Sequence, residues 1–254
     1  MKEQNLDTYN KENVIQWYLK LDYLVPAERK VFSLYKNLIT QGKLLDIGVG
    51  GGRTTGFLIK MCCNYTGIDY SEKFIQALKV KIPEARLYCM DARKLFNFAA
   101  DEFDFVNFSF NGLDYVNDND RKKIMQEIMR VLKPGGIFFF STHNKNHPNF
   151  NRAPWHVTGL SSLTRIKTFI KLIPYLFLHY KQKKKEVRNE DYAILNDSAH
   201  NYSLMTYYTT PQHLMFQLRE AGFENIKLLQ KSGAEVKLDE LDEWIFAVCQ
   251  KAIS

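Results

Sequence analysis

The sequence places carboxylates and glycines where a nucleoside could be held. Asp46 precedes a loop in which four of the five positions 48–52 are glycine, and Asp69 and Asp91 follow further along the chain. Glycine lets a backbone turn sharply and approach a ligand without a Cβ in the way. A helix that begins after such a loop offers free N–H groups to an anionic group. Because a carboxylate can accept hydrogen bonds from two vicinal ribose hydroxyls, the pattern predicts a nucleoside-binding site.

The elements around these residues are predicted to bring them together. Apolar segments indicate five strands, at 43–47, 65–69, 85–90, 103–108 and 137–141. Helices are predicted between them, at 54–62, at 72–81 with Ser71 as its N-cap, and at 118–132. Strands that alternate with helices form a parallel sheet with helices on both faces. The three aspartates then follow three consecutive strands at the carboxyl edge, where such sheets bind ligands.

The chain on either side of this alternation has a different pattern. Residues 14–38 are predicted as two helices interrupted near Pro26. The alternation stops after the fifth strand and resumes with a helix at 211–221 and an antiparallel hairpin of strands at 224–230 and 243–249. We therefore predict two parts. A core comprises residues 1–142 and 206–254, and an inserted segment, residues 143–205, forms a lid and acceptor pocket.

The composition is that of an ordinary globular protein. The chain has 254 residues, of which 45% are hydrophobic and 25% charged. None of its four cysteines forms a C-x-x-C pair, which argues against a zinc or redox site, and we predict no metal. No apolar run reaches the roughly 18–20 residues of a membrane span, and the N-terminus lacks a signal-peptide pattern. We predict a cytoplasmic protein.

The excess of positive charge belongs to one segment. The chain carries a net charge of +7. Residues 165–188 contain eight lysines and arginines and a single acid, Glu186, so that the rest of the chain is close to neutral. The stretch IKTFIKLIPYLFLHYKQKKK is apolar and then basic, which suits either an anionic membrane or lipid-linked acceptor or a packed helix followed by solvated lysines. We favour the packed helix, which is the more common of the two.

The glycine loop departs from the dinucleotide fingerprint, because Arg53 stands where the third glycine of G-x-G-x-x-G is expected. An NAD-dependent oxidoreductase therefore remains only an alternative. The chain instead resembles the class I S-adenosylmethionine-dependent methyltransferase family over residues 43–141. Five stretches carry this resemblance, in order: LLDIGVGGGRTT, GIDYS, MDARKL, FDFVNFSFNGLDYV and VLKPGGIFFFST.

The resemblance implies an α/β fold, a Rossmann-like doubly wound sheet of seven mostly parallel strands whose last strand is antiparallel. It implies an enzyme that takes S-adenosylmethionine as cofactor and releases S-adenosylhomocysteine. Gly48 and Gly50 would pass against the methionine part of the cofactor, Asp46 would support the loop, and Asp69 would hold the ribose. The other implied cofactor-binding residues are Tyr70, Asp91, Ala92, Phe108 and Ser109.

Methyl transfer needs alignment, exclusion of water and a nucleophilic acceptor atom. An acceptor hydroxyl or ammonium must lose a proton, and histidine is suited to that role near neutral pH. We predict His143, directly after the fifth strand, and His200, where the insertion returns to the core, as candidate bases, although an amine acceptor could react without one. Candidate acceptor-binding residues come from the N-terminal helices and the insertion: Trp17, Tyr18, Trp155 and Tyr202.

Two further functions stay open beside a small-molecule methyltransferase. The basic segment would suit an RNA or DNA methyltransferase. However, the position after the fourth strand reads Asn107-Phe108-Ser109-Phe110 and lacks the prolines of base-amine methylating enzymes. A non-catalytic cofactor-binding module is the other possibility. The acceptor, the atom that is methylated and the oligomeric state are not determined by the sequence.

Overall fold

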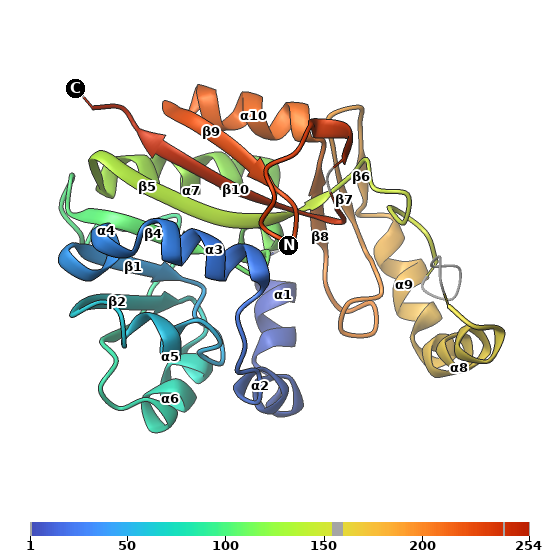
Figure 1. Cartoon of the computed structure of the whole chain (residues 1–254). Helices are drawn as coiled ribbons and strands as arrows, with labels where there is room; N and C mark the ends of the chain where they lie inside the picture. The colour runs from blue at the N-terminus through green and yellow to red at the C-terminus, as the bar shows by residue number, and fades with distance from the viewer. Residues whose placement is uncertain (1, 154–159, 241, 254) are drawn as a thin grey trace.

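A computed structural model describes residues 2–153, 160–240 and 242–253 and shows a central sheet covered by helices (Figure 1). Seven of its strands run in the spatial order β3 (Leu87–Cys89), β2 (Asn64–Asp69), β1 (Lys43–Ile47), β4 (Phe103–Phe108), β5 (Leu132–Asn144), β10 (Trp244–Lys251) and β9 (Phe223–Leu229). β10 is antiparallel to both of its neighbours, and the other six strands are parallel to one another. The expected seven-stranded sheet with an antiparallel last strand is therefore confirmed.

Three more strands extend this sheet from the far end of β5. β6 (Val187–Arg188), β7 (Tyr192–Leu195) and β8 (Thr206–Thr209) form an antiparallel ladder. β8 joins β5 where His143 pairs with Tyr208 and Asn144 with Thr209. These strands were not predicted from the sequence, because each has at most four residues and the pattern of so short a segment is weak. The segment 143–205 thus contributes to the sheet as well as to the surface. The predicted division into core and insertion stays a prediction.

Alternate residues of the strands face the two helical layers. Leu45, Val106 and Phe138 pack with α7 (Asp118–Val131) and α10 (Pro211–Glu220). Their neighbours Leu44, Phe105 and Phe139 pack on the opposite face. That face is covered by α3 (Pro26–Leu34), α4 (Lys36–Gln41), α5 (Thr55–Leu58) and α6 (Glu72–Lys81). Because a strand buried on both faces needs apolar residues on both sides, these segments are mostly apolar and do not alternate regularly between apolar and polar residues.

Several predicted boundaries are wrong by a turn or more. The helix expected at 54–62 is the four-residue α5, and the strand expected at 137–141 begins at Leu132 and runs through Pro134 and two glycines. The predicted cap is present, since the Ser71 hydroxyl accepts from the backbone N–H of Phe74 at 3.3 Å. No helix in the described part of the chain is both long and apolar enough to cross a membrane.

Two N-terminal helices, α1 (Lys2–Tyr9) and α2 (Glu12–Leu19), lie beside the carboxyl edge of the sheet (Figure 1). α1 was not predicted, because its sequence KEQNLDTY has no clear apolar face. It is held by distant contacts: the Asn5 amide donates to the backbone oxygens of Tyr115 at 3.0 Å and Met205 at 3.1 Å. Tertiary structure therefore orders a segment that its own residues do not specify.

Candidate active site

The glycine loop leaves β1 with a backbone that only glycine adopts easily. Gly48 has φ +68° and Gly50 has φ +49°. A Cβ on Gly48 would lie 2.9 Å from the ring of Phe108, so this position has no room for a side chain. A Cβ on Gly50 would meet nothing nearer than the Gly48 oxygen at 4.0 Å. The loop therefore presents bare backbone to an open space at Gly50.

Asp46 lies behind the loop and does not line the space in front of it. Its carboxylate accepts from the Thr54 hydroxyl at 3.0 Å, the Tyr65 hydroxyl at 2.9 Å and the Asn107 amide at 2.6 Å. Burial raises the pKa of Asp46 to about 6, although these hydrogen bonds act in the opposite direction. The side chain fixes the start of the loop to β2 and β4.

Asp69 joins the end of β2 to the same loop. One carboxylate oxygen accepts from the Gly50 N–H at 2.9 Å, and the other accepts from the Ser71 N–H at 2.9 Å. Burial raises the pKa of Asp69 to about 6 against the effect of these two bonds. The next residue, Tyr70, has a buried hydroxyl that finds no hydrogen-bond partner among the described residues. A buried hydroxyl of this kind calls for a partner that the chain does not provide.

These elements enclose a first cavity at the carboxyl edge of β1, β2 and β4. It is lined by all but one of the predicted cofactor residues, the exception being Asp46: Gly48, Gly50, Asp69, Tyr70, Asp91, Ala92, Phe108 and Ser109. Tyr9 from α1 and Tyr18 from α2 line the cavity from the N-terminal side. The Tyr9 ring lies 5.4 Å from Tyr115 and 6.3 Å from Tyr70, edge to face. Aromatic rings thus cover the cavity opposite the glycines.

Arg53 also lines the first cavity, and it belongs to a buried ion pair that the sequence analysis did not predict. Its guanidinium binds both carboxylate oxygens of Glu28, at 2.5 Å and 2.6 Å, and lies 4.5 Å from the ring centre of Phe110. Glu28 is on α3, so the pair ties that helix to the glycine loop. Arg53 therefore occupies the position where a dinucleotide site would need glycine, and its charged side chain has a structural role there.

A second cavity, of about 950 Å³, opens at the end of β5 and shares none of its described lining residues with the first. Its walls come from the end of β5, from α9 (Leu176–Lys183), from the return segment 195–202 and from β10. Phe110 lines the first cavity and Trp244 lines the second, and their rings meet edge to face at 5.2 Å. Phe110 has φ +59°, which is costly for a bulky side chain and is commonly found at functional sites.

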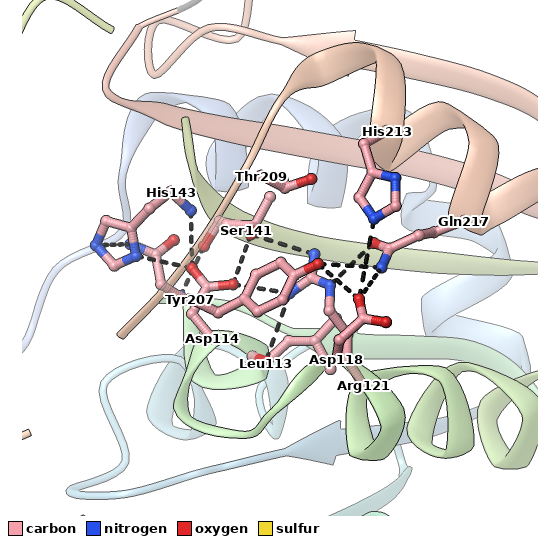
Figure 2. Close-up of polar contacts among 12 residues, drawn as sticks. Leu113, Asp114, Asp118, Arg121, Ser141, His143, Tyr207, Thr209, His213 and Gln217 are labelled. Carbon is pink, nitrogen blue, oxygen red and sulfur yellow. Dashed lines mark hydrogen bonds and ion pairs between the residues drawn. The ribbon is translucent and has the colours of Figure 1, made fainter. Parts of the chain in front are cut away.

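His143 lines the second cavity and is held by a buried carboxylate (Figure 2). Its Nδ1 lies 2.7 Å from Asp114, which also accepts from the His143 backbone N–H at 2.7 Å. Asp114 is fixed in turn by Arg121 at 2.8 Å and by the Thr142 hydroxyl at 2.5 Å. Since the carboxylate only accepts, Nδ1 carries a proton and Nε2 is the basic nitrogen. Nε2 lies 3.2 Å from the Asn111 amide.

The network around His143 sets its charge. Burial lowers the pKa of His143, but the hydrogen bond and charge of Asp114 outweigh burial, and the charges of Asp197 and Glu243 act in the same direction. The pKa is therefore raised above its ordinary value. Beyond Arg121 the hydrogen bonds continue to Asp118 (Figure 2). Gln217 on α10 accepts from Arg121 and donates to Asp118, and the hydroxyl of Tyr207 on β8 also donates to Asp118. Asp114 and Arg121 were not singled out from the sequence.

The remaining predicted residues are placed differently. His200 has a pKa lowered by burial, and its Nε2 lies 3.4 Å from the Tyr18 hydroxyl, at the cover of the first cavity. Trp17 is 50% exposed and packs edge to face on Tyr18. Tyr202 is buried and lines the second cavity. Trp155 lies outside the described residues.

Known proteins similar to this chain share its glycine-loop domain. Residues 45–140 match a family model of methyltransferase domains. An uncharacterized methyltransferase from Synechocystis is 34% identical over 96 residues, 38% of this chain and 44% of that protein. A ubiquinone biosynthesis O-methyltransferase from Coxiella burnetii is 30% identical over 162 residues, 58% of this chain and 66% of that protein.

Among solved structures, an S-adenosylmethionine-dependent methyltransferase of Thermotoga maritima, described as a possible histamine N-methyltransferase, is similar in fold. The TM-score is 0.59 at 18% sequence identity, over 99% of this chain and 100% of that one. The glycine loop and the antiparallel β10 together define the fold class of the class I methyltransferases. Residues 45–140 therefore form a methyltransferase domain, and the solved structures similar to this chain share its fold. It spans 44% and 66% of the length of the two curated relatives.

Proposed function

We propose that the protein transfers a methyl group from S-adenosylmethionine to a small-molecule acceptor. The observation that carries the proposal is the pair of adjoining cavities. One is walled by bare glycine backbone and Asp69, and the other is walled by His143, with Phe110 and Trp244 between them. A reaction between two bound molecules needs this kind of adjacency.

The residues of the first cavity fit an adenosine that carries an amino-acid tail. The open space at Gly50 and the unpartnered hydroxyl of Tyr70 are positions that a polar ligand would satisfy. Asp69 would accept from the ribose hydroxyls, Tyr70 would lie along the adenine, and the loop at Gly48 and Gly50 would hold the tail. When bound, the sulfonium cofactor supplies an already activated methyl group.

The second cavity would hold the acceptor. His143 Nε2 would take the proton of an acceptor hydroxyl, so that its oxygen could receive the methyl group while S-adenosylhomocysteine leaves. Asp114 would keep the imidazole oriented and stabilise its positive charge, in the way a carboxylate positions a catalytic histidine. The name of the Coxiella relative, a ubiquinone biosynthesis O-methyltransferase, supports oxygen as the methylated atom.

Calorimetry and a transfer assay test the two halves of this proposal separately. We expect S-adenosylmethionine and S-adenosylhomocysteine to bind at one site in the wild type and NADH not to bind. We then expect radiolabelled methyl to pass to phenolic or other small hydroxylated acceptors. Binding without transfer to any acceptor of a broad panel would favour a non-catalytic module, and NADH binding alone would favour an oxidoreductase. Transfer to tRNA or duplex DNA in place of small molecules would overturn the acceptor assignment.

A further inference from the structure

The helical hairpin formed by α8 (Ser162–Leu172) and α9 exposes large apolar side chains. The hairpin, here defined as residues 162–183, stands out from the side of the sheet (Figure 1). Of the residues in its two helices, only Leu172 is buried. Its exposed large apolar and aromatic residues are Leu163, Ile166, Phe169, Ile170, Ile173, Tyr175, Phe177 and Tyr180. The packed helix that we favoured from the sequence of this stretch is therefore wrong for most of the hairpin, because these side chains are exposed.

These side chains are arranged as a face and are not scattered. Ile166, Phe169, Ile170 and Ile173 follow the spacing i, i+3, i+4, i+7, which brings them to one side of a helix. Ile166 is 56% exposed and Ile170 is 60% exposed, so this side faces away from the protein. A contiguous exposed apolar face of this kind marks an interaction surface.

The segment that carries this face is strongly basic. Eight basic residues lie on or next to the hairpin: Arg165, Lys167, Lys171, Lys181, Lys183, Lys184, Lys185 and Arg188. Glu186 is the single acid between the first and last of them, and it is paired with Arg188 at 2.8 Å. A partner must therefore offer both an apolar phase and negative charge. The net charge of this surface opposes pairing with a second copy of the same surface.

We propose that the hairpin docks on an anionic lipid membrane. An amphipathic helix lies in the membrane interface with its apolar side chains among the acyl chains, while lysines and arginines meet anionic headgroups. The phosphates of a nucleic acid would satisfy the lysines but would leave Ile166, Phe169 and Ile170 exposed. The apolar face is therefore the feature that favours lipid over RNA. The inference does not depend on the reaction proposed above, although α9 also lends His179 and Lys183 to the second cavity.

Sedimentation with lipid vesicles tests the docking. We expect the wild type to sediment with vesicles of phosphatidylcholine and phosphatidylglycerol in equal parts and to stay in solution with phosphatidylcholine alone. The triple variant Ile166→Ser/Phe169→Ser/Ile170→Ser should bind the anionic vesicles with an affinity at least about tenfold lower than that of the wild type. Lys181→Glu/Lys184→Glu/Lys185→Glu should weaken binding to a similar degree, and added salt should do the same to the wild type.

A matched control removes the same number of exposed apolar side chains from the core surface. Leu34, Val80 and Phe96 are 67%, 83% and 75% exposed, and Leu34→Ser/Val80→Ser/Phe96→Ser should bind vesicles as the wild type does. Equal binding of the hairpin variant and this control would overturn the proposal. So would wild-type binding to neutral vesicles alone, a dimer that the hairpin variant abolishes, or binding to RNA but not to anionic vesicles.

Discussion

The first and second cavities are made of different kinds of structure. The first is built from turns that follow adjacent strands, so that Asp46, Gly50 and Asp69 fall within 24 residues of one another. The second joins His143 to Tyr202 and Trp244, three segments that the sequence keeps far apart. Local pattern therefore determines the glycine side of the first cavity, whereas tertiary contacts determine its aromatic cover and the whole of the second cavity. We expect substitutions in the two regions to separate cofactor binding from turnover.

The largest expected effect is on turnover, from His143→Gln. Loss of a general base lowers kcat by about 100-fold to 10,000-fold, whereas the affinity for S-adenosylmethionine should stay unchanged. Because the pKa of His143 is raised, wild-type kcat should rise with pH as the imidazole loses its proton above its ordinary range, and the variant should lose this rise. His147→Gln, in the following loop, is the control and should behave as the wild type. Equal kcat values for His143→Gln and the wild type would remove His143 from the mechanism.

Next in size is a loss of stability from Glu28→Gln. Removing one partner of a buried ion pair leaves the other charge uncompensated, and we expect the free energy of unfolding to fall by about 3 kcal/mol. Urea denaturation gives this quantity. Glu235→Gln removes the partner of Lys227 in an exposed pair at 3.8 Å and should cost less than about 1 kcal/mol. Similar losses for the two variants would show that the pair between α3 and the glycine loop does not tie these elements together.

Asp69→Ala should change the affinity of the first cavity for the cofactor and leave the second cavity unchanged. Loss of a hydrogen-bonded charged acceptor should weaken S-adenosylmethionine binding by about 1–3 kcal/mol. Calorimetry measures the change, with Asp239→Ala in an exposed 3₁₀ helix as control. An undiminished affinity would withdraw the ribose assignment from Asp69.

The smallest expected effect comes from pH. Burial raises the pKa of Asp69 to about 6, so the carboxylate needed at the ribose is lost as the pH falls through that value. From pH 7.5 to pH 5 the dissociation constant for the cofactor should increase roughly tenfold. Unfolding does not explain such a change, because a carboxyl whose pKa is raised on folding contributes stability at low pH and loses it as the pH rises through 6. If Asp69→Ala shows the same pH dependence as the wild type, another group is responsible.

The sequence was a good guide where neighbouring residues determine the structure. The strands β1, β2 and β4, the cap at Ser71 and the antiparallel hairpin at the C-terminus were all predicted from local pattern. Asp114 was missed although it lies in the stretch FDFVNFSFNGLDYV, because its partner His143 is 29 residues away and nothing local links the two. The ion pair between Arg53 and Glu28 spans 25 residues and was missed for the same reason.

Helix α1 affects how fast the product can dissociate from the first cavity. It holds Tyr9 over the first cavity, while Asn5 and Thr8 bond to the backbone of Met205 and Ser203, where the chain returns to the sheet. S-adenosylhomocysteine bound beneath Tyr9 would have to pass this helix to leave, and the helix is anchored to a segment about two hundred residues further along the chain. We therefore expect S-adenosylhomocysteine to dissociate slowly and to inhibit the protein as it accumulates.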